Sequence, residues 1–408
     1  MLLQGGMLRE DVDFLSKDRG KYLIMPNGVQ DIFSMNYVDG YSVGPHSILG
    51  LMKLDRSRWE VEETARWAFG RETFVAKGAV RYILPVEYET FFEVYGGQHL
   101  EDFDPDPVMP LSQSLMASGI FGWNDYKLYE NTSAGVRLAM PLLFDLKMSA
   151  KVGWERRRPV VNSRKSNFFG AHAESNDPRV RVPHKASEIK LYDGPIAAEL
   201  AKASLRFDYL HRRSLLVIDD MTARETSDYP LLSLLLDMGI GKNREADRFR
   251  FLSIDMRASQ TMTLPRYDDQ LRYMGSAGLM LRHGTIGLAD MHHFDASSFW
   301  WQRENEISRF ALLDNYELST SDCWTEAHAE WNSQQLLFTR LMTPREGLRE
   351  FVQMHSVAVP HHRLHWEVQY GWDLLNMLRL GISLGFNDQV YRGTAFTMIL
   401  NLNAAQKK

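Results

Sequence analysis

Two pairs of adjacent histidines are the residues of this chain that most suggest metal chemistry. His292-His293 is followed by Phe294-Asp295 and preceded by Asp290, and a second pair is His361-His362. Neighbouring side chains of a strand point to opposite faces, so neither pair can hold one ion from a strand, although a loop would allow it. We interpret both pairs as polar loop or rim positions and predict no metal site.

Paired acids and a run of arginines suggest other chemistry. Asp219-Asp220 and Asp268-Asp269 are of the kind that bind calcium or hydrolyse glycosides. Neither pair has the spacing of a calcium loop, and both lie beside expected turns, which indicates solvated acidic tips. Arg156-Arg157-Arg158 has the chemistry to bind anionic lipid headgroups or phosphate. We favour the alternative, a strand end with interfacial and lumenal arginines.

Sequence signatures of catalysis are missing. Serine and histidine are plentiful, but the sequence has no nucleophile elbow, ordered triad or glycine-rich phosphate loop. The single cysteine, Cys323, cannot form an internal disulfide, and we interpret it as a small apolar residue that is buried or faces lipid. We therefore predict no catalytic residue, no cofactor and no enzymatic activity.

The elements that carry these residues are predicted to be strands, because apolar and polar residues alternate over long stretches. Successive side chains of a strand point to opposite faces, so such a stretch has one apolar and one polar face. In 144–155 the apolar row is Phe144, Leu146, Met148, Ala150, Val152 and Trp154, and the polar row is Asp145, Lys147, Ser149, Lys151, Gly153 and Glu155. Similar rows occur at 204–209, 252–259, 365–372 and 378–386, with weaker copies at 58–69, 73–84, 87–96, 324–331 and 394–402.

Several of these rows are as long as a strand that crosses a bilayer, and tryptophan and tyrosine tend to lie at their ends. A soluble β-sandwich also alternates, but its strands are usually about 3–10 residues long and their polar face meets bulk water. The pattern therefore predicts an all-β fold, an antiparallel transmembrane β-barrel with a polar lumen and long loops. At roughly 24 residues for each strand and its turn, the chain is long enough for about 14–16 strands.

Composition narrows the class of protein further. No stretch approaches about 18 consecutive apolar residues, so a membrane helix is excluded. The mean hydropathy of -0.32 is low for a helical membrane bundle but suits a barrel, whose lumen and loops are polar. The net charge is -5 and no basic stripe is present, so nucleic-acid binding has no support. The lipid bilayer is the expected partner, alongside other envelope proteins.

One barrel domain is expected over residues 34–403, after an irregular lead-in at 1–33 and before a polar tail at 404–408. Long loops are expected at 158–192 and 292–312, and a short helix at 345–353. The mixed charges of the polar rows predict ion pairing or a loop plug in the lumen rather than a wide ion-selective pore. The first residues show no signal peptide, so we expect a fragment or a mis-started product, unless the membrane interpretation is wrong.

Four segments resemble a Bacteroidetes outer-membrane family of unknown function, whose members carry a carboxypeptidase-regulatory-like domain before a β-barrel. These segments are 37–45, 124–130 together with 155–159, 229–240, and 310–322, and the last matches best. They follow the family's order from roughly 35 to 402, so the chain resembles the barrel region only. The sequence after Trp331 departs from the family pattern. The resemblance implies an outer-membrane location and a barrel, and it carries over no catalytic residue.

Three functions remain open at this point. The first is a non-enzymatic outer-membrane barrel of the cell envelope that acts in transport or in envelope assembly and scaffolding. The second is a soluble all-β ligand-binding or enzyme domain that uses the loops 158–192 and 292–312. The third is a divergent barrel of the outer-membrane insertase superfamily, because Tyr391-Arg392-Gly393 resembles a loop motif of that superfamily.

Overall fold

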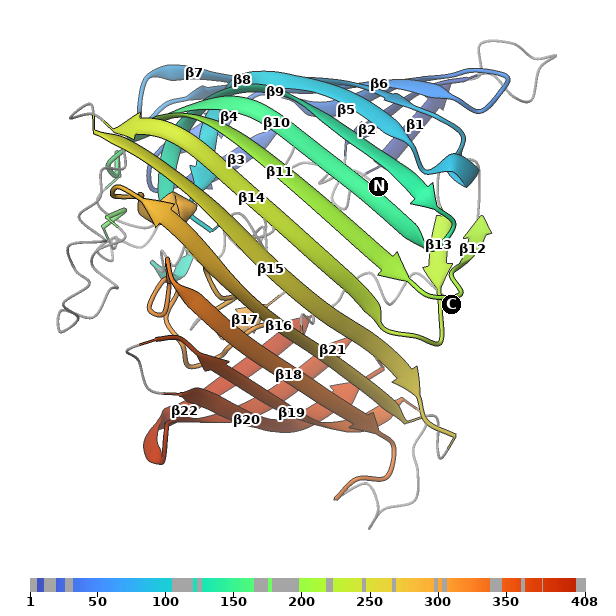
Figure 1. Ribbon diagram of the computed structural model, residues 1–408, viewed down its shortest axis with the longest axis vertical. Coiled ribbons are helices and arrows are strands. Elements are labelled where there is room, and N and C mark those ends of the chain that lie inside the picture. Colours follow the sequence, from blue (N-terminus) through green and yellow to red (C-terminus); the bar gives the residue numbers. More distant parts are fainter. Residues whose placement is uncertain are drawn as a thin grey trace.

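The computed structural model of the chain is mostly β-structure, and 20 of its described strands form one large sheet that curves round into a barrel (Figure 1). It describes residues 6–10, 20–25, 32–104, 120–122, 127–164, 175–177, 198–217, 223–243, 247–265, 269–296, 300–302, 307–337, 347–360, 364–375 and 377–400. No helix in these ranges is long and apolar enough to cross a membrane.

Seventeen of the described strands follow one another antiparallel round the sheet. The first nine are β1 (Gly6–Glu10), β2 (Gly20–Met25), β5 (His46–Met52), β6 (Arg58–Ala68), β7 (Thr73–Ile83), β8 (Phe91–Asp102), β9 (Leu128–Leu143), β10 (Leu146–Pro159) and β11 (Ala198–Leu210). The other eight are β14 (Leu231–Asn243), β15 (Arg248–Thr263), β16 (Gln270–His283), β18 (Cys323–Ser333), β19 (Leu348–Ala358), β20 (His365–Leu374), β21 (Leu378–Asn387) and β22 (Val390–Leu400).

The remaining elements are short. The hairpin β3 (Phe33–Asn36) and β4 (Gly40–Val43) pairs with the end of β6, and β12 (Ser214–Val217) pairs with β13 (Ala223–Thr226) in a separate sheet. Strand β17 (Trp301–Gln302) lies parallel to β22. Two 3-10 turns are η2 (Val86–Tyr88) and η5 (Leu288–Asp290).

The chain kinks at Gly44, so that β4 and β5 pair one after the other with the same edge of β6. Strand β5 pairs with the first part of β6, and β4 pairs with its end, where Ser42 lies opposite Ala68. The φ angle of Gly44 is +149°, and a Cβ there would overlap the carbonyl oxygen of Ala65. Only glycine fits this position without moving the backbone of the neighbouring strand.

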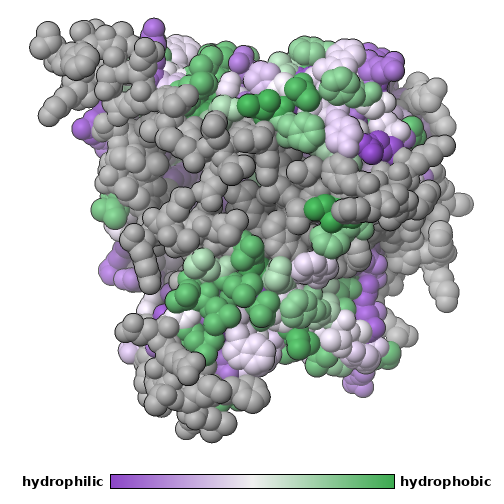
Figure 2. Space-filling model, turned by 180° about the vertical axis from the view of Figure 1, so that it is seen from behind, coloured by the Kyte–Doolittle hydropathy of each residue, from purple (hydrophilic) through white to green (hydrophobic). Residues whose placement is uncertain are grey.

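Burial along the strands is the reverse of that in a soluble protein. On β18 the inward residues Glu326, His328 and Glu330 are buried, whereas Trp331 on the outward row is 44% exposed. On β21 the outward residue Ile382 is 51% exposed. Hydrophobic side chains gather on the lower part of the face in Figure 2, over the region where Figure 1 places β20 to β22. The alternation therefore sorts polar residues to the inside and apolar residues to the outside.

The predicted all-β antiparallel barrel is confirmed. Fourteen of the described strands have ten residues or more, in line with the expected number, and the short β1 to β5 and β17 bring the sheet to 20. Strands β1 and β2 lie inside 1–33, where an irregular lead-in was expected. The expected helix at 345–353 is wrong: β19 begins at Leu348, because pairing with β18 and β20 overrides a local preference for helix. The tail 404–408 lies outside the described residues.

Candidate functional site: the lumen and its plug

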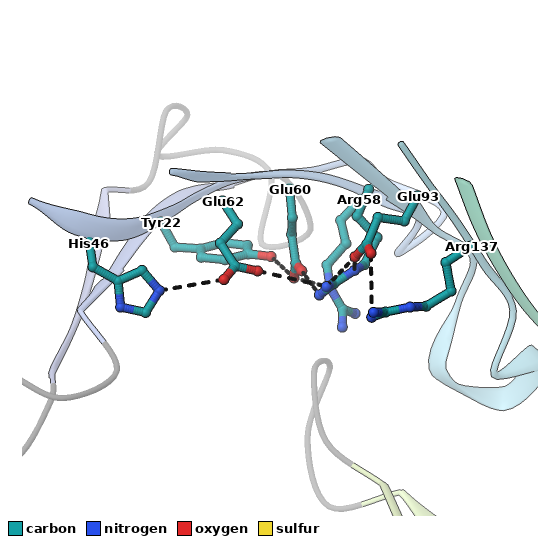
Figure 3. A network of polar contacts seen from close by, with 8 residues as sticks. Tyr22, His46, Arg58, Glu60, Glu62, Glu93 and Arg137 are labelled. Atoms are coloured by element: carbon teal, nitrogen blue, oxygen red, sulfur yellow. Dashed lines mark hydrogen bonds and ion pairs between the residues drawn. The ribbon is translucent and has the colours of Figure 1, made fainter. Parts of the chain in front are cut away.

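A balanced ion-pair network covers the inner face of the first half of the sheet (Figure 3). Arg58 Nε donates to Glu60 over 2.9 Å, and Arg81 Nε donates to Glu93 over 2.7 Å. Arg137 Nη1 lies 3.3 Å from Glu93. The network contains three carboxylates and three arginines, which are Glu60, Glu62, Glu93, Arg58, Arg81 and Arg137. Because the charges neutralise one another, this wall lacks the single-sign ring that an ion-selective pore uses.

The segment between β16 and β18 folds into the lumen. We call its described residues, 284–296, 300–302 and 307–322, the plug. Two isolated bridges hold it together, His292 with Thr320 and Ala296 with Phe310. Its apolar side chains form one buried cluster with side chains of β8 to β19 or of residues next to them, including Tyr129, Leu200, Phe249, Phe251, Trp324 and Val357. The loop expected at 292–312 is therefore part of a packed core where it is described.

A buried ion pair joins the plug to β10. Arg157 Nη1 donates to Asp290 Oδ2 over 2.8 Å, and Arg157 Nη2 donates to Glu155 over 2.8 Å. The side chains of Arg157 and Asp290 are 3% and 1% exposed. Breaking one partner of such a pair is strongly destabilising, because the other charge stays buried.

A second anchor is Tyr316 of the plug. Its hydroxyl donates to Asp102 at the end of β8 over 2.6 Å and accepts the backbone N–H of Lys127 over 3.0 Å. Burial raises the pKa of Tyr316 well above its usual value, so the phenol stays protonated and keeps its donor.

The last strands hold the opposite side of the plug. The carboxylate of Glu367 on β20 accepts the backbone N–H groups of Ala311 and Leu312, both over 2.8 Å. Arg392 on β22 donates to Glu317 over 2.8 Å through Nη1. The anchors therefore come from two parts of the wall, β8 and β10 on one side and β20 and β22 on the other. The plug is thus bound across the lumen.

The ring of Phe310, next to Ala311 in the plug, is surrounded by three histidines of the barrel wall. Its ring centroid lies 5.1 Å from that of His328 and 5.7 Å from those of His355 and His365. Phe310 is fully buried, and His328 and His355 hydrogen bond through their Nδ1 atoms over 2.9 Å. The histidines of the wall thus bind an aromatic side chain of the same protein.

The histidines at 292 and 293, which were predicted to lie in a loop, lie in the plug, and both contact other residues of the protein. The ring of His292 stacks on Trp324 with centroids 3.9 Å apart, and His293 hydrogen bonds with Ser319 and the Leu288 carbonyl. Burial lowers the pKa of His292 to about 3 and that of His293 to about 4, so both are neutral at pH 7. Within the described ranges, no group of three or more His, Cys, Asp or Glu residues is placed to hold a metal ion.

Other residues singled out from the sequence are dispersed. In the arginine run, Arg157 is buried while Arg156 and Arg158 are exposed. Asp269 accepts the Trp331 indole N–H over 3.2 Å. Asp268, the pairs at 219–220 and 361–362, and most of 158–192 lie outside the described residues, and Cys323 is exposed at the start of β18.

Tyr391, Arg392 and Gly393, which resemble a loop motif, lie in β22. Sequence reasoning missed Glu367 and Tyr316. The sequence gives only a weak signal for Glu367, an acid at an inward position of a strand. It gives no local signal for Tyr316, because the partners of Tyr316 are distant in the sequence.

Comparison with known proteins places the chain in a family. No curated protein matches it in sequence. It is similar to the solved structure of CdiB from Acinetobacter baumannii, with 13% identity and a TM-score of 0.40 over 97% of this chain and 58% of that one. A second similar structure is BamA from Haemophilus ducreyi lacking POTRA domains 1–3, with 8% identity and a TM-score of 0.41 over 96% and 74%. The chain thus spans less than two thirds of the length of CdiB. Residues 15–372 match the C-terminal domain of a family of unknown function (DUF5686), and the chain belongs to that family.

Proposed function

We propose that this chain is a non-enzymatic barrel of the outer membrane, embedded through its apolar outer face and closed by its own plug, with a role in envelope assembly or gated transport. The observation that carries the proposal is the reversed burial, in which Glu330 and Glu367 are buried while Ile382 and Leu384 are exposed. A bilayer would bury this outer face, whereas water would meet a large apolar surface. The same face disfavours the alternative of a soluble ligand-binding or enzyme domain.

The lengths of the connections support one orientation in the membrane. The longest connections, between β8 and β9, β10 and β11, and β16 and β18, all leave the same end of the sheet. Outer-membrane barrels have short periplasmic turns and long extracellular loops, so this long-loop end is proposed to face outward. An origin in Bacteroidetes and a preceding carboxypeptidase-regulatory-like domain stay predictions from the family resemblance.

A heat-modifiability gel tests the membrane barrel directly. The full chain is folded into detergent micelles and run on SDS gels with and without boiling. A faster band in the unboiled lane that is lost on boiling is expected, because a folded barrel resists unfolding by the detergent. Identical bands from a protein that is monodisperse without detergent would overturn the proposal.

Planar-bilayer recording tests whether the plug closes the lumen. The wild-type protein should show no steady conductance, because the plug is tied to four strands. Glu367→Gln should produce frequent openings, since a neutral amide binds the two N–H groups of the plug less strongly than a carboxylate. Glu87→Gln is the matched control, because Glu87 lies in the exposed turn η2 and its side chain is 50% exposed. A large steady conductance in the wild type would show an open pore.

The edge of β22 favours an assembly role as a second candidate. Strand β22 pairs with β21 along its length, but in the described part of the chain only Met398 and Ile399 have a strand partner on the other edge, the short β17. Unpaired strand edges can add a strand from another chain. A photo-crosslinker at Thr394 should then reach strands of other barrel precursors in envelopes. Crosslinks to this chain's own β1 alone would count against the assembly role.

A further inference from the structure

A groove of about 620 Å³ lies over β10, β11, β14, β15 and β16, with apolar residues of the outer face along it. Strand register explains why it is there. Ala201 of β11 lies between Trp154 and Ile240, and Ala203 lies between Val152 and Met238. Two small side chains flanked by large ones leave a furrow along β11 on the apolar outer face. The width of the furrow follows from the sizes of these side chains, so the furrow is present whenever the strands are paired in this register.

Basic side chains stand at the long-loop end of this groove. Arg250 of β15 lies opposite His283 of β16, and both line the groove and are exposed. One register step nearer the loops, Arg248 lies opposite Lys242 on the same face. Lys242 lies 3.3 Å from Glu199, whereas no described acid is within ion-pair distance of Arg250. An exposed arginine that no acid of the described ranges neutralises thus lies where the apolar outer face ends.

We infer that this groove binds a membrane lipid that carries a phosphate monoester. An acyl chain would lie along Ala201 and Ala203, and the phosphate would meet the guanidinium of Arg250 with His283 beside it. Arginine binds phosphate oxygens in a fork and is more weakly hydrated than lysine, which suits a site at the edge of the hydrocarbon layer. The neighbouring cation Arg248 favours a dianionic headgroup over a zwitterionic one. This inference rests on the proposed membrane location and adds to it a lipid class and a binding site.

Native mass spectrometry of the full chain in detergent micelles tests the inference, with phosphatidic acid and phosphatidylcholine of equal chain length as probes. The wild type should retain one phosphatidic acid and much less phosphatidylcholine. Arg250→Gln should weaken the retention about tenfold, because it removes the charge that binds the phosphate. Ala203→Trp should weaken it as well, with every charge in place, because the indole fills the groove.

Arg158→Gln is the matched control. Arg158 is an exposed arginine at the same end of β10, and it does not line the groove. Retention in this variant should stay within about twofold of the wild type, whereas a loss equal to that of Arg250→Gln would show diffuse charge attraction and overturn the site. Equal retention of both lipids, or wild-type retention in both Arg250→Gln and Ala203→Trp, would overturn it too. Each protein is first run on an SDS gel without boiling. A wild type without a heat-sensitive band would contradict the proposed membrane location rather than the lipid site. If one of the two groove variants fails to fold, the other still tests the site.

Discussion

Arg157 on β10 and Asp290 in the plug form a buried ion pair 2.8 Å long, which joins the wall of the barrel to the segment inside it. Each charge is stabilised by the other, because both side chains are buried away from water. Wall and plug should therefore lose stability together when either partner is removed.

Replacing Asp290 with asparagine tests this dependence. We expect Asp290→Asn to lower the free energy of unfolding by about 3 kcal/mol, because Arg157 would keep only Glu155 as a buried counter-charge. Urea unfolding in detergent, followed by tryptophan fluorescence, measures the change. Arg156→Gln is the control, since Arg156 lies on the exposed face of the same strand with its side chain 47% exposed. Equal midpoints for both variants would contradict the role of the pair.

Neighbouring residues of β10 should respond oppositely to changes of charge. Met148 lies on the apolar row two residues after the start of β10, so Met148→Arg places a charge against lipid and should weaken the heat-sensitive band. Lys147 is on the inward row, 2.5 Å from Glu89. Lys147→Met should leave assembly intact, because Glu89 keeps Arg213 at 2.7 Å. Equal tolerance at the two positions would count against the membrane barrel.

Mild acid should loosen the plug. Burial lowers the pKa of His292 to about 3 and of His293 to about 4, whereas both titrate near 6.5 in the unfolded chain. The unfolded state therefore takes up protons first, so stability is complete above pH 6.5 and falls as the pH drops towards 4. The loss should approach about 1.4 kcal/mol per pH unit for each histidine.

Unfolding midpoints between pH 7 and pH 5 measure this loss. His292→Phe keeps an aromatic ring to stack on Trp324 but cannot take up a proton, so it should reduce the pH dependence by about half and leave the contribution of His293. A profile in this variant that matches the wild type would mean that other groups cause the acid sensitivity.

The kink at Gly44 should tolerate no side chain. Gly44→Ala places a Cβ against the Ala65 carbonyl at a φ of +149°, and we expect a loss of about 2–3 kcal/mol and a low yield of folded barrel. Gly78→Ala is the matched control on β7, because its Cβ would lie an ordinary 3.6 Å from the Glu62 carbonyl. The folded fraction on unboiled gels compares the two, and similar yields would show that the kink is flexible.

Local pattern determined the strands and their faces, because the direction of a strand side chain depends only on its position along the strand. Residues 144–155 illustrate this: their apolar row faces outward and Lys147, Lys151 and Glu155 face inward, as the alternation predicted. The pattern was weaker where strands are short. It therefore does not predict β1 and β2 in the lead-in, and the local preference for helix at 345–353 is overridden by the pairing of β19 with β18 and β20.

The partners inside the lumen were decided only by the tertiary structure. Arg157 meets Asp290, and Glu367 meets the backbone of Ala311, across separations of 133 and 56 residues. No local period encodes such contacts, because they depend on how far the sheet curves and on where the segment between β16 and β18 enters it. The sequence by itself determined an inside-out β-sheet with a charged interior, and the curvature of that sheet decided that its charges bind one another and a plug.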